Sequence, residues 1–332
     1  MLIAAHRVCH VLKLSSVRDR YSLLTLLSAR TMASSAQIIG GRAKLNDGNE
    51  IPMIGLGISR INGQESLSNS VKAALESGYR LFDTAELYGN EAELGAALEE
   101  YLPKYGLKRE DIFITTKVQT KDGDATKWAE ESIMGSLKRL RTKYLDMVLL
   151  HFPRDRWTGT DDAYEINKKG RREVWQKMEQ LKDRGLIKSI GVSNYEVYHL
   201  VELLEYAVHK PAVNQVEFHP YFTRRTLLHF CAQHRIFVQA FSSLLWGNQE
   251  ILNEPVVKQL AEKFAVSPQT ILYAFAVRSG VGIIPKSVTP ARIHDNLVKV
   301  AATPLSQDEL KSLRELDRNA AFCPRCFPWR CL

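Results

Sequence analysis

The sequence predicts an α/β protein in which eight parallel strands, with helices between them, close into a single (β/α)8 TIM barrel. Short strands rich in Val and Ile alternate with segments of helical apolar spacing along most of the chain, and no linker interrupts the series. The strands show no alternation of polar and apolar residues, as expected for a parallel sheet that helices cover. The chain has 332 residues, of which 45% are apolar and 25% charged, and such a barrel takes roughly 250 residues as one domain.

A short β-hairpin is expected ahead of the barrel, because residues 44–57 carry the turn dipeptide Asp47-Gly48 between two extended pieces. A C-terminal tail is expected over the barrel mouth. The barrel strands are expected at 51–57, 79–82, 111–116, 145–150, 186–193, 212–218, 236–241 and 281–285. Amphipathic spacing places helices between them at 64–78, 91–106, 126–140, 171–185, 198–208, 224–235 and 267–280.

An open, doubly wound sheet is the alternative for a chain of alternating strands and helices. A dinucleotide-binding sheet of that type needs the spacing G-x-G-x-x-G in the turn after an early strand. The candidate turn, from Gly55 to Gly63, lacks that spacing. The strand count and the missing turn favour the closed barrel.

Residues 1–36 are set apart as an N-terminal extension, and residues 37–332 as the barrel domain. The extension is rich in Arg, Ser and Leu and almost free of acidic residues, as mitochondrial presequences are. An upstream extension, with Met32 as a second start, is the other interpretation. No apolar run is long enough to span a membrane. We therefore expect no membrane partner and a cytoplasmic protein, or a mitochondrial one if the extension is a presequence.

The charge and the cysteines argue against several other classes. The net charge of +8 comes partly from the extension, and basic and aromatic residues do not alternate, so no nucleic-acid partner is expected. Five cysteines, two of them isolated, argue against a disulfide framework. Cys323 and Cys326 have C-x-x-C spacing, but no second pair or histidine stands at zinc-finger distance. We expect free thiols in the tail and no metal site.

Polar or charged residues end the predicted strands one after another. In a parallel barrel the carboxyl ends of the strands open into loops that converge on one mouth. A buried hydrogen-bonding group costs free energy unless it is paired. A solvated strand end would explain any one such residue, but a series in register predicts a site. The series consists of Asp83, Lys117, His151, Ser193, Asn194, Gln215 and Lys286, with the aromatic Phe241 at a further strand end.

The stretch RLFDTAELYGNE places Tyr88 five residues after Asp83, on a loop that can bring its phenol over the carboxylate. Lys117, at the next strand end, is expected to approach both. An ammonium beside a phenol lowers the phenol's pKa from about 10, and a carboxylate keeps that ammonium charged. Tyr88 is therefore predicted to donate a proton. His151 is predicted to offer a hydrogen bond to an oxygen that gains negative charge.

These four residues resemble the catalytic Asp, Tyr, Lys and His of the aldo-keto reductases. The blocks GYRLFDTAELYGNE, IFITTKV, YLDMVLLHFP and IKSIGVSN are similar to signature blocks of that family, and the similarity runs from about residue 41 to 320. The resemblance implies catalytic roles for Asp83, Tyr88, Lys117 and His151. It also implies an NADP-dependent oxidoreductase that reduces aldehydes or ketones to alcohols, with hydride from the nicotinamide and a proton from Tyr88.

The resemblance further implies that NADPH or NADP+ lies across the barrel mouth. Ser193, Asn194 and Gln215 match the residues that hold the carboxamide, and Phe241 matches the aromatic residue that stacks on the nicotinamide. The turn that follows matches the pyrophosphate loop and adds two cofactor-binding residues, Ser242 and Leu244. It departs from the family's pattern at Leu245, where a glycine is usual.

The segment IPKSVTPARIHDN matches the adenosine end of the cofactor site. Lys286, Ser287 and Arg292 are placed for a 2′-phosphate, and Asn296 for the adenine. Two cations and a hydroxyl near a helix start are suited to a phosphate. A solvated, basic helix start would also explain this segment taken alone.

The substrate is expected to contact Tyr88 and His151, with aromatic residues of the surrounding loops as an apolar wall. Each aromatic residue is alternatively explained as ordinary packing. The candidates are Phe152, Trp157 and Trp246, together with Phe327 and Trp329 of the tail.

The chain is thus expected to be a monomeric reductase of small carbonyl compounds. A non-enzymatic alternative is a cofactor-binding barrel that regulates a channel or serves as a structural protein. A barrel of unrelated chemistry, an isomerase or a metal-dependent hydrolase, is a second alternative. The sequence has no His-x-His motif or carboxylate cluster for a metal, which weighs against the hydrolase.

Overall fold

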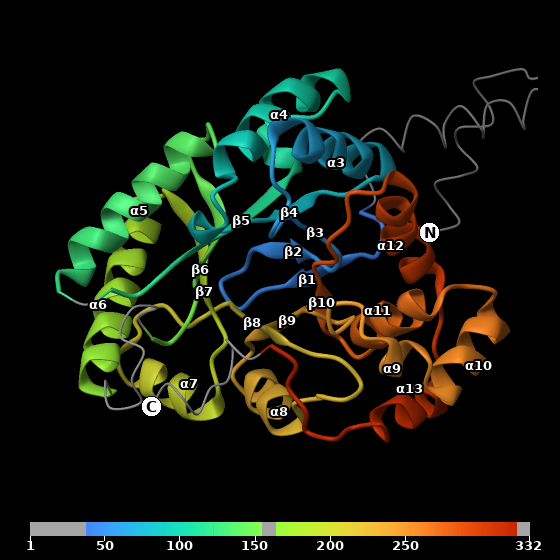
Figure 1. The fold of residues 1–332 in the computed structure, drawn as a ribbon. Coiled ribbons are helices and arrows are strands. Elements are labelled where there is room, and N and C mark those ends of the chain that lie inside the picture. The colour runs from blue at the N-terminus through green and yellow to red at the C-terminus, as the bar shows by residue number, and fades with distance from the viewer. Residues whose placement is uncertain (1–37, 122, 155–163, 324–332) are drawn as a thin grey trace, which may run out of the picture. The chain divides into compact units, whose positions relative to one another are not determined.

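A computed structural model describes residues 38–121, 123–154 and 164–323 of the chain (Figure 1). The compact unit that carries the fold begins at Ile38. The extension proposed for residues 1–36 lies outside the described residues, so the division into extension and barrel domain stays a prediction.

Eight parallel strands form one sheet in sequence order, which confirms the predicted barrel. The sheet closes between its first and last strands, where Ile54 bridges Ile283 and Gly55 N donates to Ile283 O at 2.9 Å. The strands are β3 (Leu56–Gly57), β4 (Leu81–Asp83), β5 (Phe113–Val118), β6 (Leu145–Leu150), β7 (Ile187–Ser193), β8 (Val213–Glu217), β9 (Phe237–Phe241) and β10 (Gly282–Ile283).

Glycine makes the closing seam possible. A Cβ atom built on Gly57 would lie 2.7 Å from the carbonyl oxygen of Ile284, closer than a real side chain can approach. Gly57 N instead donates to Pro285 O at 3.0 Å, which adds a bond to the seam. The close approach of two backbones explains the glycine at this position of the strand.

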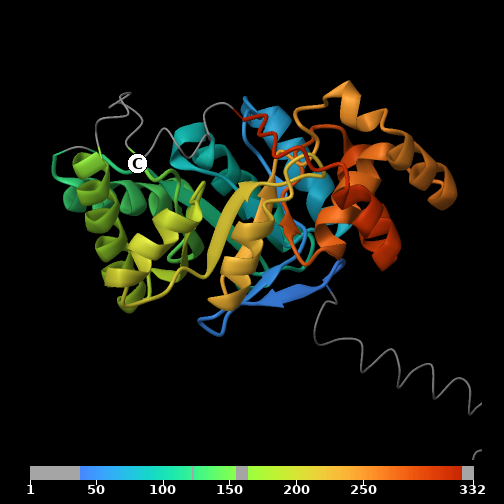
Figure 2. The ribbon, with the colours of Figure 1, turned by 90° about the horizontal axis from the view of Figure 1, so that it is seen from below.

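The predicted hairpin is formed by β1 (Arg42–Lys44) and β2 (Glu50–Pro52), which pair antiparallel around the Asp47-Gly48 turn. Asn49 Nδ2 donates to Ser189 Oγ at 2.9 Å, at the start of β7. The hairpin therefore covers the amino ends of the barrel strands, opposite the mouth (Figure 2). The expected strand 51–57 is accordingly split, because its first two residues pair within the hairpin.

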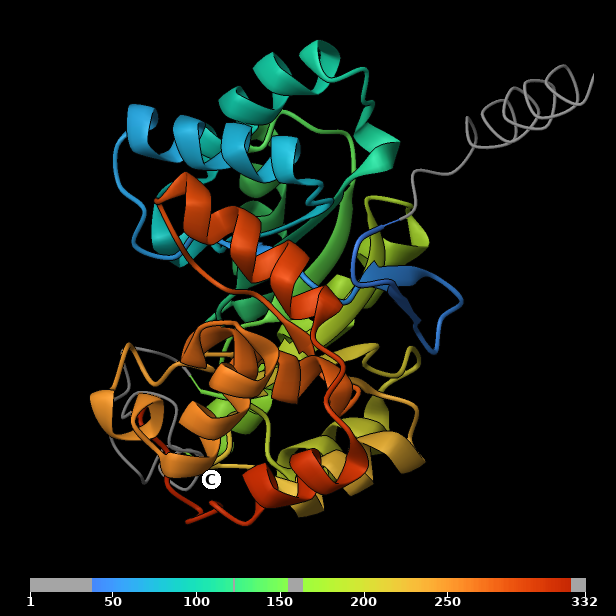
Figure 3. The same cartoon turned by 90° about the vertical axis from the view of Figure 1, so that its right-hand side faces the viewer.

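Helices surround the sheet, and the ring that they form closes as the barrel does. In Figures 1 and 3, α12, which follows β10, lies beside α3, which follows β3. The helices are α3 (Gln64–Ser77), α4 (Glu91–Lys104), α5 (Ala125–Arg139), α6 (Tyr164–Asp183), α7 (Val197–Tyr206), α8 (Arg225–Gln233), α9 (Gln249–Leu252), α10 (Pro255–Phe264), α11 (Pro268–Arg278), α12 (Pro290–Ala302) and α13 (Gln307–Arg314), with 3-10 turns η1 (Glu86–Tyr88) and η2 (Arg109–Asp111).

Local sequence signals explain where several helices begin. Ser267 Oγ accepts from Thr270 N at 3.2 Å and caps α11, whose first residue is a proline. Ser306 and Glu309 form a capping box at the start of α13. Such side chains satisfy backbone N–H groups that have no partner within the helix.

Helix α6 starts at Tyr164, seven residues before the expected helix 171–185. Residues 164–170 contain a single aliphatic residue, Ile166, which is exposed, so this part of the helix has no apolar face. Without an apolar period, the sequence does not indicate a helix there. Arg171, the first residue of the expected helix, is almost fully buried and donates to Glu202 Oε2 at 2.5 Å and to Pro153 O at 2.8 Å.

Two apolar clusters form the core. The larger one lies between the sheet and the helices and includes Trp175 and Phe275. The smaller one fills the lower interior of the barrel, where Leu45 and Ile51 of the hairpin region close it from below. Its members are Leu45, Ile51, Leu81, Phe113, Met147, Leu149, Ala212 and Val213. Apolar packing therefore ends below the mouth, and polar side chains occupy the upper interior.

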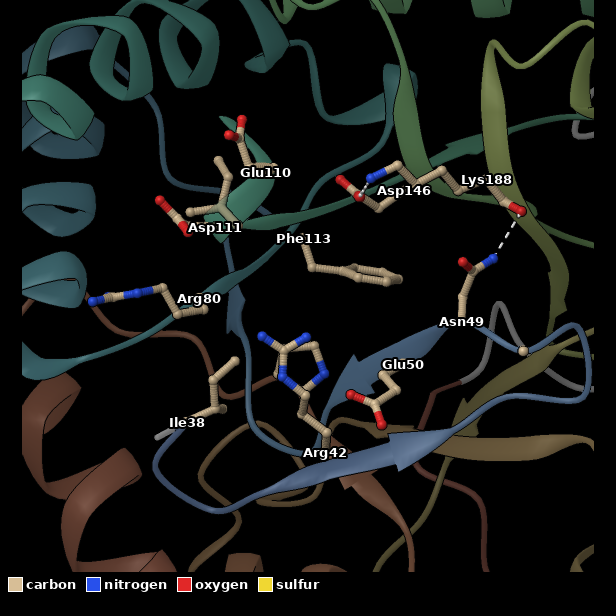
Figure 4. A pocket seen from close by; sticks show the side chains of 13 residues that line it. Ile38, Arg42, Asn49, Glu50, Arg80, Glu110, Asp111, Phe113, Asp146 and Lys188 are labelled. Carbon is tan, nitrogen blue, oxygen red and sulfur yellow. Dashed lines mark hydrogen bonds and ion pairs between the residues drawn. The ribbon is translucent and has the colours of Figure 1, made fainter. Parts of the chain in front are cut away.

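A cavity of about 320 Å³ lies between the hairpin and the amino ends of the strands (Figure 4). Arg42 and Glu50 line it from the hairpin, and Asp146 lines it from β6. The Asp146 carboxylate is bonded to Arg109 Nη2 at 2.7 Å and to Lys188 Nζ at 3.3 Å. None of the strand-end residues of the predicted site lines this cavity, so it belongs to the closed end of the barrel.

Cys323 is disulfide-bonded. The expectation of free thiols throughout the tail is therefore wrong for this residue. Cys231 is a free, buried cysteine.

None of the described helices is both long and apolar enough to cross a bilayer.

Candidate active site

Asp83 and Lys117 form an ion pair inside the upper end of the barrel. Asp83 is the last residue of β4 and pairs with Thr115 of β5, so Lys117 stands two residues nearer the mouth. Lys117 Nζ lies 2.5 Å from Asp83 Oδ1, and the two residues are only 2% and 1% exposed. Buried charges need partners of this kind, because desolvation costs each of them several kcal/mol and removal of one partner costs about 3–5 kcal/mol.

Tyr88 is brought over this pair by the 3-10 turn η1. Tyr88 N donates to Ala85 O at 3.0 Å, and Gly89 ends the turn at a φ of 68°. Asn90 anchors the loop, since its Nδ2 donates to Ile58 O at 2.9 Å and to Ile61 O at 3.0 Å. The turn therefore fixes the direction of the phenol.

Lys117 joins the ion pair to the phenol. Its Nζ donates to Tyr88 Oη at 3.3 Å, to Thr84 O at 2.8 Å and to Asp83 Oδ1 at 2.5 Å. The ammonium also lies 5.0 Å from the centre of the Tyr88 ring. Each of the three N–H bonds of the ammonium thus has an acceptor, and the expected contact among Asp83, Lys117 and Tyr88 is present.

The pKa of Tyr88 is raised, whereas the sequence argument expected it to be lowered. Burial of the phenol is the largest cause, and it outweighs the lowering effect of the Lys117 ammonium, while the Asp83 carboxylate adds to the increase. The contact with an ammonium follows from the sequence, whereas the degree of desolvation depends on the tertiary packing around the phenol. The phenol is therefore neutral and carries its proton at neutral pH.

Burial also acts on the two neighbouring bases. Burial lowers the pKa of Lys117, but the charges and hydrogen bonds of Asp83 and Tyr88 raise it further, so the net shift is upward. Burial and the Lys117 charge hold the pKa of His151 well below its ordinary value. The site therefore contains an ammonium and a neutral imidazole.

His151 follows β6 and faces Tyr88 across the mouth. The two rings are 5.8 Å apart and nearly perpendicular. Phe152 stacks on the imidazole with the ring centres 4.5 Å apart. His151 Nδ1 is buried and has no hydrogen-bond partner among the described residues. The contact of Tyr88, His151 and Phe152 with a substrate stays a prediction.

The three residues expected to hold a carboxamide lie together at the ends of β7 and β8. Ser193 Oγ donates to Gln215 O at 2.8 Å. Asn194 Nδ2 donates to Ser193 Oγ at 3.1 Å and to His151 O at 2.9 Å. Asn194 has a φ of 63°, a value that asparagine tolerates better than most residues. Their Oγ, amide and backbone groups form one network beside His151.

Gln215 links that network to the ion pair. Its Nε2 donates to Asp83 Oδ2 at 2.8 Å and to Gln239 Oε1 at 2.8 Å. Gln239, which was not predicted as a site residue, is fully buried in β9 directly opposite Gln215. The signal that could have indicated Gln239 is a glutamine inside a strand of otherwise apolar residues. Gln239 Nε2 has no hydrogen-bond partner among the described residues.

Phe241, the last residue of β9, is half-buried, and the turn that follows it begins at Ser242. Ser242 has a φ of 53° and Leu245 one of 48°. Leu245 adopts this conformation where the resembling family usually has glycine, so the turn keeps its backbone shape at some conformational cost. Trp246 Nε1 donates to Ser242 Oγ at 3.0 Å.

Trp246 is 62% exposed, and the Arg60 guanidinium lies 4.8 Å from the centre of its ring. This contact joins the loop after β3 to the turn after β9. Trp246 shares its turn with Ser242 and Leu244, two residues assigned to the cofactor. Its predicted contact with substrate stays a prediction.

The residues predicted for the adenosine end lie after β10 and at the start of α12. Lys286 and Arg292 are exposed, and neither has a carboxylate partner in the part of the chain that the structure describes. Ser287 Oγ accepts from Thr289 N at 3.1 Å, just before the helix. Asn296 lies one turn beyond Arg292, since the two are four residues apart.

Trp157, Phe327 and Trp329, three of the aromatic residues expected near the substrate, lie outside the described residues. No group of three or more metal-binding side chains occurs among the residues with a described structure.

Comparison with known proteins agrees with this arrangement. The profile described as "Aldo/keto reductase family" matches residues 53–318. The chain belongs to the aldo/keto reductase family. It is therefore an NAD(P)H-dependent oxidoreductase, and the resemblance seen in its sequence blocks is confirmed.

The match to each of the following relatives extends over nearly the whole length of that relative. "Methylglyoxal reductase DkgA" of Escherichia coli (strain K12) is 36% identical over 281 residues, which are 85% of this chain and 95% of that protein. A "Probable NAD(P)H-dependent D-xylose reductase" of Emericella nidulans is 33% identical over 303 residues, covering 84% and 94%. The crystal structure of MGS-M4, an aldo-keto reductase from a Medee basin deep-sea metagenome library, has a TM-score of 0.76 and 33% identity, covering 84% and 96%.

Proposed function

We propose that this reductase uses NADPH to convert small aldehydes and ketones to alcohols, with Tyr88 as the proton donor. The observation that carries the proposal is the single ammonium of Lys117 bonded to both Asp83 and Tyr88. A phenol in that contact can give up its proton because the charge left on its oxygen meets a fixed cation. The neutral, protonated state of the phenol is the state that a proton donor needs.

The substrate oxygen is proposed to lie between Tyr88 and His151, whose rings face each other 5.8 Å apart. A neutral imidazole can donate one N–H to the carbonyl oxygen without giving up a charge. Its low pKa keeps it in that state, while Tyr88 supplies the proton. Two donors on one oxygen stabilise the negative charge that develops on it.

The nicotinamide end of the cofactor fits the groups beside this position. Gln215 Nε2 is occupied by Asp83 and Gln239, which leaves its Oε1 as an acceptor with no partner among the described residues. A carboxamide N–H₂ is a suitable donor for that oxygen. Bound nicotinamide supplies the hydride for the carbonyl carbon. Ser193, Asn194 and Phe241 would orient the ring.

The phosphate end supports NADPH over NADH. Lys286 and Arg292 are two cations without carboxylate partners among the described residues, and α12 begins between them. An unpaired guanidinium can bind a phosphate through two parallel hydrogen bonds. Ser287 would add a hydroxyl, and Asn296 would contact the adenine. The pyrophosphate would lie along the turn that carries Ser242 and Leu244.

Small carbonyl compounds are the proposed substrates. The relatives named as methylglyoxal and D-xylose reductases act on such compounds by name, and the Phe152 ring stacks on His151 beside the proposed position of the carbonyl. We further propose that the chain is a monomer in the cytoplasm, or in mitochondria if residues 1–36 direct import. Chain mass in solution and the location of a fusion to the full chain test these two points.

The deciding experiment measures NADPH binding and consumption by the purified full chain. Binding is followed by quenching of intrinsic fluorescence, and turnover by loss of NADPH absorbance with methylglyoxal, pentoses and aromatic aldehydes. Saturable binding with turnover of at least one carbonyl class supports the proposal. Tight binding without turnover of any carbonyl would favour the non-enzymatic, cofactor-sensing alternative.

A further inference from the structure

A buried carboxylate at the mouth holds the segment that follows α13. Glu217 is the last residue of β8 and is only 2% exposed. Its Oε1 accepts from Phe322 N at 2.8 Å, and its Oε2 accepts from Cys323 N at 3.1 Å. His219 Nε2 lies 3.0 Å from Oε1 as a third donor. Backbone groups from a segment more than a hundred residues away therefore meet this carboxylate.

The position of Glu217 places this contact next to the catalytic groups. Successive side chains of a strand point to opposite faces, so Glu217 points to the same side as Gln215, toward the barrel interior. Gln215 reaches Asp83, so that side is the active-site side. Glu217 is also directly opposite Phe241 in the pairing of β8 with β9. Glu217 thus lies two residues nearer the mouth than Gln215, beside the residue proposed to stack on nicotinamide.

The held segment places the Phe322 ring beside the residues that follow β8. The Phe322 ring contacts His219 edge-on at 5.9 Å and Tyr221 at 6.3 Å. In Figure 2 the segment after α13 lies on the side of the barrel opposite the β1–β2 hairpin. Two backbone bonds to Glu217 thus hold the residues that carry and follow this ring at the mouth end of β8.

A second set of contacts holds the same segment farther out. Arg318 N and Ala320 N both donate to Tyr221 O, at 3.2 and 3.1 Å. Arg318 Nη2 donates to Glu254 Oε1 at 2.9 Å. These contacts would keep the segment near the barrel if Glu217 lost its hold, so Glu217 controls the placement of Phe322 and Cys323 rather than attachment of the whole segment.

We propose that Glu217 is a positioning residue that sets substrate preference by fixing Phe322 at the mouth; this rests on the reductase function proposed above. A carboxylate suits the task because both of its oxygens accept hydrogen bonds. Glutamine has one acceptor oxygen, and its N–H₂ would face a second N–H. Carbonyl compounds with a large apolar substituent contact the Phe322 wall, whereas compounds of two or three carbons do not reach it.

The test compares Glu217→Gln with Glu254→Gln, which removes a carboxylate contact of the same segment away from the mouth. Glu217→Gln should raise KM for an aromatic aldehyde by about tenfold relative to methylglyoxal. It should leave kcat for methylglyoxal and the dissociation constant of NADPH within about twofold, a split that general loss of stability does not produce. Glu254→Gln should leave the ratio of the two KM values unchanged.

Phe322→Ala keeps the buried carboxylate and serves if Glu217→Gln does not fold. It should shift the ratio of KM values in the same direction. Hydrogen exchange of the 322 and 323 amides, which needs no turnover, should be slow in the native chain and faster in Glu217→Gln. An unchanged KM ratio in Glu217→Gln and Phe322→Ala, or fast exchange of both amides in the native chain, would overturn the proposal. A native chain that turns over no carbonyl but protects both amides would instead defeat the proposed reductase function.

Discussion

Gln215 Nε2 donates a hydrogen bond of 2.8 Å to Asp83 Oδ2, between two strands that are not neighbours in the sheet. The other oxygen of the same carboxylate binds Lys117. One carboxylate therefore connects the proposed carboxamide site with the ammonium that contacts Tyr88. The position of the nicotinamide and the position of the proton donor are set by a shared group.

Replacement of Tyr88 by Phe should reduce kcat by roughly 10² to 10⁴-fold, the usual contribution of a positioned general acid. NADPH binding should stay within a few-fold of the native value, because the cofactor does not need the phenol oxygen. Tyr105→Phe, outside the site, is the matched control. Most of the native rate surviving in Tyr88→Phe would show that another group delivers the proton.

Replacement of Gln239 by Leu should weaken the positioning of Gln215. One N–H of Gln215 Nε2 then loses its acceptor in a buried place, which costs about 1–3 kcal/mol. Removal of the unpartnered Gln239 Nε2 offsets part of that cost. We expect a small loss of unfolding free energy in urea and a larger dissociation constant for NADPH. Native cofactor affinity in this variant would mean that Gln215 is oriented without Gln239.

Replacement of Arg292 by Ala should raise the dissociation constant of NADPH by roughly tenfold or more. The dissociation constant of NADH should rise much less, because only NADPH carries the 2′-phosphate. Both dissociation constants can be measured by fluorescence quenching. Lys299→Ala removes a cation from the last turn of the same helix, where Lys299 pairs with Asp295, and serves as the control. Equal losses for the two cofactors would contradict the phosphate role of Arg292.

His151 should make the folded protein less stable as pH falls below about 6.5. Burial and the Lys117 charge lower its pKa in the folded state, so below about 6.5 the unfolded chain binds a proton that the folded chain does not. The unfolding free energy then falls with pH by up to about 1.4 kcal/mol per unit from this group. Unfolding in urea from pH 7 to 5 should show a shallower fall in His151→Gln than in the exposed control His229→Gln. Identical slopes would show that His151 is charged in the folded state.

Replacement of Asp146 by Asn should lower stability but leave catalysis unchanged. Asp146 lies at the closed end of the barrel, where its carboxylate bonds Arg109, Lys188 and the backbone N–H of Ile114. Loss of these charge-assisted bonds should lower the unfolding free energy by about 1–3 kcal/mol. The kcat and the NADPH dissociation constant should match the native values. A large change in KM would instead indicate that the cavity of Figure 4 takes part in substrate binding.

The order of the strands was predictable because it depends on local patterns, whereas helices α9, α10, α12 and α13 were not predicted. Apolar period, glycine stops and the Asp47-Gly48 turn are properties of short stretches, and they placed the hairpin and the eight strands correctly apart from their ends. Helix α6 was predicted too short, because residues 164–170 contain one aliphatic residue, Ile166, which is exposed, and so show no apolar period. The expected free thiol at Cys323 was also wrong, since cysteine spacing alone does not give pairing.

The sequence by itself determined which residues stand at the ends of the strands, and hence that Asp83, Lys117 and His151 surround one mouth. Only the tertiary structure decided how strongly each is desolvated, which reversed the expected direction of the pKa shift of Tyr88. It also decided that Gln239 and Glu217 take part, through contacts between strands and with a distant segment. A strand's own pattern fixes which side a residue faces, but its burial and its partners depend on what the rest of the chain packs against it.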